Sequence, residues 1–67
     1  MEMIPLKSSN LVAAGYDDEA REMTVEFQSG TYVVECPRSI FDGLVTSLSP
    51  GGYYHRNVRD IYPARRA

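Results

Sequence analysis

The residues best suited to chemistry lie together near the end of this 67-residue chain, between Tyr53 and Arg66. Arginine guanidinium groups bind phosphates through paired hydrogen bonds, and aromatic rings stack on unpaired bases. Six side chains of this segment are therefore the predicted contacts for RNA, a nucleotide or another phosphate-bearing ligand: Tyr53, His55, Arg56, Arg59, Arg65 and Arg66. In this interpretation the four arginines contact phosphates, while Tyr53 and His55 stack or form hydrogen bonds.

The same segment has two other interpretations. Residues 53–61 have the spacing of a short helix whose inner face carries Tyr54, Val58 and Ile61. On such a helix Arg56 can pair with Asp60, four residues on. The tyrosines would then belong to the core, and the arginines would be solvated or paired with acidic residues elsewhere in the chain. A surface for protein interaction is the third interpretation.

Charge is divided unevenly along the chain. The total is −2, from seven basic and nine acidic residues, which argues against a general coat for nucleic acid or acidic membranes. Residues 1–47 hold three basic and eight acidic residues, whereas residues 48–67 hold four basic residues and one acidic residue. The body is thus acidic at −5 and the last twenty residues are basic at +3. We expect a polyanion to bind at the basic end.

Three other groups of residues have spacings that raise a chemical question. Asp17-Asp18-Glu19 lacks the spacing of a calcium loop, so a solvated turn capped by Asp17 is the favoured interpretation. Cys36 with His55 lacks a marked third catalytic group, which favours a structural thiol. Ser49-Pro50-Gly51-Gly52 suggests either an anion cradle or an ordinary turn between helices. We therefore predict no enzyme activity, catalytic residue, metal site or cofactor.

The elements that must position these residues follow from hydrophobic periodicity. Strands are predicted over residues 11–16, 21–28 and 31–36, with Ser29-Gly30 as a tight hairpin turn. A short additional strand around residues 3–6 is limited to a sheet edge by Pro5. In the middle strand Met23, Val25 and Phe27 share one face, which predicts that it packs against the core.

Two helices are predicted to follow the strands. Pro37 suits the first turn of a helix, and an apolar stripe marks the face that packs on the sheet: Ile40, Phe41, Leu44, Val45 and Leu48. The second helix is the one expected over residues 53–61, with Pro63 ending it. The predicted fold is therefore one α+β domain over residues 1–67: a three-stranded antiparallel meander packed against one longer and one short C-terminal helix.

The short length of the chain and its single cysteine bear on its partners and its location. A domain this short has a narrow margin between burial and chain entropy, and Cys36 alone cannot form an internal disulfide. We therefore expect self-association into a homo-oligomer or binding to another protein. No membrane-spanning run and no signal peptide is visible, so no membrane partner is expected. A single thiol without a signal fits the cytoplasm.

The residues discussed above also carry a resemblance to a known family. Gly15-Tyr16-Asp17, the alternating strand, Gly30 with Tyr32, and the run from Ser49 to Tyr62 resemble the KTSC domain family. The run is similar to that family's Ser-x-Gly-x-aromatic-aromatic-Asn-x-x-Ile-Arg-x-x-Tyr pattern. The family includes domains at the C-terminus of some lysyl-tRNA synthetases and stand-alone bacterial and phage proteins. This context implies RNA binding.

Two departures from the family pattern concern the predicted contacts. The family's central Tyr-x-Tyr reads Tyr32-Val33-Val34, so the second aromatic ring is absent, and His55 replaces the family's Asn. The leading hypothesis is a non-catalytic binding domain for RNA or another phosphate-bearing ligand. The alternative is a protein-interaction or self-assembly module, such as a small inhibitor of a larger protein.

Overall fold

The computed structural model describes every residue from Met1 to Ala67, and its centre is the antiparallel meander predicted from the sequence. Strand β2 (Leu11–Asp17) pairs with β3 (Glu22–Phe27), which pairs with β4 (Gly30–Glu35). The two-residue turn that joins β3 to β4 is Gln28-Ser29, and Gly30 begins β4 opposite Phe27 with a φ of +154°, a value that side chains disfavour. The three predicted strands are confirmed, and the predicted hairpin turn lies one residue nearer the N-terminus than Ser29-Gly30.

Two edge strands complete a five-stranded sheet in the order β1-β2-β3-β4-β5. Strand β1 (Ile4–Pro5) is the additional strand expected near the N-terminus. Strand β5 (Ala64–Arg66) was not predicted, because a three-residue strand with two arginines has no apolar alternation. It forms by pairing with β4, where Arg66 lies opposite Tyr32 and Arg65 lies opposite Val33.

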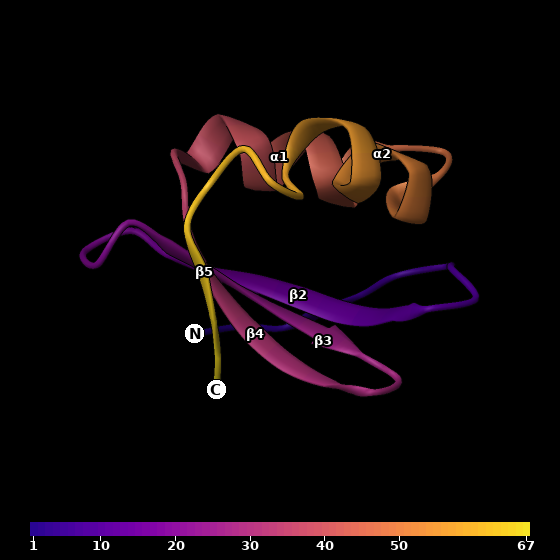
Figure 1. Ribbon diagram of the computed structural model, residues 1–67, viewed down its shortest axis with the longest axis horizontal. Coiled ribbons are helices and arrows are strands. Elements are labelled where there is room, and N and C mark those ends of the chain that lie inside the picture. The colour runs from indigo at the N-terminus through magenta and orange to yellow at the C-terminus, as the bar shows by residue number, and fades with distance from the viewer.

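Both helices cover the same face of the sheet (Figure 1). Helix α1 (Arg38–Thr46) begins directly after Pro37, and α2 (Pro50–Asn57) has a proline in its first turn. The α+β fold is thereby confirmed. Neither helix is long and apolar enough to cross a membrane.

Both helices end earlier than the apolar spacing predicted. Helix α1 stops at Thr46, and Leu48 is fully exposed instead of completing the apolar stripe. The second helix lies three to four residues nearer the N-terminus than predicted, since Pro50 starts it and Asn57 ends it. The chain then turns, with Asp60 at a left-handed φ of 63°, so Ile61 leaves the inner face and is 58% exposed.

The core lies between the sheet and the helices, and nine buried side chains form it: Leu11, Ala14, Met23, Val25, Val34, Cys36, Phe41, Leu44 and Val58. Met23 and Val25 come from the predicted inner face of β3, whereas Glu26 on the other face is exposed. No helix covers that other face (Figure 1). The alternation in β3 therefore set the correct side of the sheet toward the core.

Candidate functional site

An open groove of about 570 Å³ lies between α2 with the turn that follows it and the end of the sheet where β3 turns into β4. We call it the α2–β4 groove, and its side chains come from four separate parts of the chain: Asn10, Leu11, Phe27, Ser29, Tyr32, Tyr54, His55, Val58, Arg59, Asp60 and Ala64. The hairpin positions Phe27 and Tyr32, while the packing of Val58 into the core fixes the end of α2 beside them.

Three half-buried aromatic rings form one wall of this groove. The Phe27 ring contacts Tyr54 edge-on at 5.1 Å between centroids and Tyr32 edge-on at 5.7 Å. Edge-to-face contacts of this kind hold rings in defined orientations. Burial is also the main cause that raises the pKa of Tyr54. The aromatic wall is therefore held in place before any ligand binds.

Two of the predicted cations border the groove. Arg59 lines it directly, and its Nη1 lies 3.4 Å from Nδ1 of His55, one turn earlier. A guanidinium can donate to that nitrogen only when the imidazole is neutral and Nδ1 carries no proton. The backbone N–H of Arg59 donates to the Tyr54 carbonyl at 2.9 Å, which fixes the chain where α2 ends.

Arg66 approaches the same groove from β5. Its Nη1 donates to the Tyr32 hydroxyl at 3.1 Å and its Nη2 donates to the Ser29 carbonyl at 3.1 Å. The guanidinium carbon lies 5.6 Å from the centre of the Tyr32 ring, within the range of a cation–π contact. A β-carbon at Gly30 would lie 2.7 Å from Nη2, so glycine makes room for this arginine.

The other predicted contacts lie elsewhere. Tyr53 packs between the helices, where its ring contacts Gly43, and burial raises the pKa of its hydroxyl. Arg56 lies along α2 beside Gly52 and forms no ion pair with Asp60, contrary to the predicted spacing. The structure thus places His55 and Arg59 in the lining of the groove and Arg66 against its residues Tyr32 and Ser29, and it leaves Tyr53 and Arg56 outside.

Arg65 lies on the opposite face of the sheet from Arg66. Successive side chains of a strand point to opposite faces, and Arg65 Nη1 donates to the Glu22 carboxylate at 3.0 Å. This hydrogen bond is the main cause that raises the pKa of the Arg65 guanidinium. Pairing with the acidic body was one of the interpretations from the sequence, and the structure shows it for Arg65.

Among the groove residues absent from the predicted contacts are the three rings of the aromatic wall: Phe27, Tyr32 and Tyr54. Each was placed in a strand or on an inner helix face, which is correct but incomplete. The available signal was Tyr32, which stands at the retained tyrosine of the family's Tyr-x-Tyr. Pairing between strands brings it to α2, and sequence spacing does not show that.

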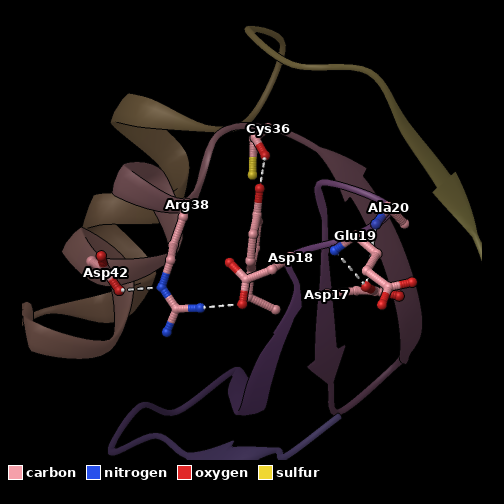
Figure 2. Close-up of polar contacts among 8 residues, drawn as sticks. Asp17, Asp18, Glu19, Ala20, Cys36, Arg38 and Asp42 are labelled. Carbon is pink, nitrogen blue, oxygen red and sulfur yellow. Dashed lines mark hydrogen bonds and ion pairs between the residues drawn. The ribbon is translucent and has the colours of Figure 1, made fainter.

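The acidic run forms a capped turn, as favoured from the sequence. Asp17 Oδ1 accepts hydrogen bonds from the backbone N–H groups of Glu19 and Ala20 at 3.0 and 3.2 Å. Figure 2 shows these contacts beside the ion pair of Asp18 with Arg38 at 2.7 Å. No group of three or more His, Cys, Asp or Glu side chains is placed to hold a metal ion.

Cys36 lies in the core, where burial raises the pKa of its thiol. Its backbone carbonyl accepts a hydrogen bond from the Tyr16 hydroxyl at 2.7 Å, which ties the end of β2 to the start of α1 (Figure 2). His55 is exposed and belongs to the groove. This arrangement favours the structural interpretation of the thiol.

Comparisons with known proteins agree with the geometry of the fold. The sequence profile of a family described as the KTSC domain matches residues 7–62. The crystal structure of a KTSC domain protein from Yersinia pestis superposes with a TM-score of 0.93. It is 22% identical in sequence, and the alignment covers 98% of this chain and 96% of that one. None of the curated proteins matches the chain.

Proposed function

The chain belongs to the KTSC domain family, and on this premise we propose that it is a small, non-catalytic binding domain whose α2–β4 groove takes up RNA or another phosphate-bearing ligand. The observation that carries the proposal is the meeting of two arginines with an aromatic wall. Arg59 lies in the turn that follows α2 and lines the groove, and Arg66 comes from β5 and donates to the hydroxyl of Tyr32, whose ring lines the groove.

The chemistry of the groove suits such a ligand. Guanidinium groups donate to phosphate oxygens with charge-assisted hydrogen bonds, while aromatic rings accept bases without regard to sequence. His55 adds a polar ring beside Arg59. The placement of charge also explains how an acidic protein can bind a polyanion, because the cations at the groove act locally.

The test is the affinity for a labelled single-stranded RNA at several salt concentrations. Replacing Arg59→Ala and Arg66→Ala together is expected to weaken binding by about tenfold or more, since each hydrogen bond to a charged group contributes about 1.5–3 kcal/mol. The matched control is Arg56→Ala with Arg65→Ala, which removes the same charge from the same segment but outside the groove. Equal losses in both double variants, with both folded, would contradict the proposal.

A second candidate function is a protein-interaction or self-assembly module. The observation that favours it is the helix-free face of the sheet, where half-buried Thr24, Thr31 and Val33 lie among the acidic residues Glu22, Glu26 and Glu35. A sheet face of this composition can pack against a second subunit. Light scattering on a size-exclusion column tests it: we expect a homodimer that Val33→Lys dissociates, and a strict monomer at high concentration would contradict self-assembly.

We also propose a cytoplasmic location, because the protein's one cysteine is an unpaired thiol buried in the core. Cell fractionation with a tagged chain tests this, and recovery from an oxidising compartment would contradict it.

A further inference from the structure

The cations of this chain do not form a continuous path across its surface. Arg59 is the one cation that lines the α2–β4 groove, and Arg66 reaches it through its contacts with Tyr32 and Ser29. Arg65 pairs with Glu22 on the far face of the sheet. Arg38 is held between Asp18 and Asp42 at the start of α1. The positive charge of the groove is therefore limited to two guanidinium groups.

The remaining cations lie away from the groove as well. Arg21 sits in the turn before β3, at the opposite end of that strand from the hairpin that borders the groove. A six-residue strand is about 20 Å long, so Arg21 is a strand length away. Arg56 lies beside Gly52 on α2, and Lys7 lies in the loop that precedes β2. None of these extends the pair formed by Arg59 and Arg66.

A single-stranded nucleic acid that is bound along its length needs a different surface from this groove. Domains that bind single-stranded nucleic acid along its length combine a basic path with several stacking platforms and cover about 4–16 nucleotides. This molecule is 28 Å long at most, and its aromatic wall is confined to one groove. The volume of the α2–β4 groove, about 570 Å³, falls in the range of about 300–1,000 Å³ that is typical of small-molecule sites.

Asp60 adds a group that an anion site alone would not contain. It lines the groove next to Arg59 and holds a left-handed φ of 63°. A carboxylate repels phosphate but accepts hydrogen bonds from hydroxyl groups, as acidic residues do from ribose in dinucleotide sites. Aromatic rings, two guanidinium groups and one carboxylate are the partners that a base, a phosphate and a ribose require.

We propose that the α2–β4 groove binds one ribonucleotide unit, either a free nucleotide or the end residue of an RNA. This inference rests on the proposed function and narrows it. The base lies against the wall of Phe27, Tyr32 and Tyr54. The phosphate lies between Arg59 and Arg66, and a ribose hydroxyl donates to Asp60.

The first experiment measures affinity for adenylates of increasing length, from the 5′-monophosphate to an octanucleotide. We expect a change of less than about fivefold over the whole series, because each further stacked base would add about fivefold or more. The logarithm of affinity should fall with the logarithm of salt concentration with a slope of about −0.7, the value for one neutralised phosphate on a single strand. Affinity that climbs with each added nucleotide, or a much steeper slope, would overturn the inference and leave the proposed function standing.

If none of the adenylates binds, the proposed function itself is contradicted. A covalently closed circle of the same octanucleotide separates the two sources of the ligand. Tighter binding of the monophosphate than of the linear octamer assigns a free nucleotide, whereas tighter binding of the linear octamer than of both others assigns a chain end. A circle that binds as tightly as the linear octamer, with both at least as tight as the monophosphate, overturns the inference.

The second experiment tests the ribose contact. We expect the protein to prefer the ribonucleotide over its deoxy form by about tenfold, and Asp60→Asn to reduce that preference, since a charged acceptor is replaced by a neutral one. Asp42→Asn on α1 is the matched control, because it removes the same charge away from the groove. The NMR signals of groove residues show whether the Asp60→Asn variant still binds the nucleotide in the groove. If they still shift and the preference for the ribonucleotide is unchanged, the contact between Asp60 and the ribose is excluded.

Discussion

Arg65 and Glu22 join the basic end of the chain to its acidic body within a single molecule. Arg65 Nη1 donates to Glu22 Oε2 at 3.0 Å, across β4, although the two residues are 43 positions apart in the sequence. One interpretation from the sequence paired the arginines of the basic end with acidic residues elsewhere in the chain. The ion pair shows that part of this attraction is satisfied inside one chain.

Glu22→Gln should lower the stability of the protein slightly, and the loss should disappear at high salt. Ion pairs at a partly exposed surface are weak and are screened by added ions. Urea denaturation at low and high salt measures the effect. Glu26→Gln, on the same face but with no ion pair, serves as the control and should show no salt-dependent difference.

Truncation to alanine should destabilise the protein strongly at Leu44 and hardly at all at Leu48. Leu44 is fully buried, so Leu44→Ala is expected to reduce the free energy of unfolding by about 2–5 kcal/mol. Leu48 lies beyond the end of α1 and is fully exposed, so Leu48→Ala should change it by less than about 0.5 kcal/mol. Denaturant titrations compare the two, and similar losses would place Leu48 in the core after all.

Gly43→Ala should destabilise the contact between the helices. A β-carbon at Gly43 would lie 2.6 Å from Cζ of Tyr53, which is closer than real contacts allow. The gain in helix propensity is about 1 kcal/mol, whereas overpacking costs about 1–3 kcal/mol. Thermal unfolding should therefore show a net loss.

The control for this prediction is Gly52→Ala on α2. Its β-carbon would meet the guanidinium of Arg56, the far end of a flexible side chain that can move aside. Gly52→Ala should raise the melting temperature while Gly43→Ala lowers it. A rise in both would show that Tyr53 does not depend on the absence of a side chain at Gly43.

Alkaline pH should destabilise the fold before any arginine titrates. Burial raises the pKa of the Cys36 thiol above its ordinary 9.0 and that of the Tyr54 hydroxyl above 10.0. The unfolded chain ionises first, so stability is complete below pH 9 and falls as pH rises through these values. Urea midpoints across this range measure the fall. Cys36→Ala should remove the part that begins near pH 9, and a curve identical to that of the parent would argue against a buried thiol.

Much of the fold could be predicted because its strongest signals are local. The alternation of Met23, Val25 and Phe27 predicted the inner face of β3, and Ser29-Gly30 predicted the hairpin after it to within one residue. Pro37 marked the start of the first helix. Each of these signals depends only on neighbours in the sequence.

The differences arise where contacts distant in sequence or chain reversals decide the structure. Apolar spacing extended both helices past their ends to Leu48 and Ile61, because periodicity carries no information on where a helix stops. Strand β5 depends on pairing with β4, since Ala64-Arg65-Arg66 has little strand propensity of its own.

Only part of the candidate site could be located from the sequence, for the same reason. The proximity of Arg59 to His55 follows from their separation of four residues, whereas the contact of Arg66 with Tyr32 requires the β4–β5 pairing. Arg65 and Arg66 are neighbours in the sequence but lie on opposite faces once β5 forms. The sequence shows these arginines as one basic segment, and the pairing of β5 with β4 divides Arg65 and Arg66 between two faces.

The order of the strands has a kinetic consequence. Strands β1 to β3 each pair with the next strand along the chain through a short loop, and these loops close early in folding. Strand β5 joins β4 only after the chain has passed through both helices, which requires closing a much longer loop. Hydrogen exchange should therefore report opening of β5 at lower free energy than opening of the meander. Each such opening withdraws Arg66 from Tyr32, so the groove is dismantled and rebuilt many times while the rest of the protein stays folded.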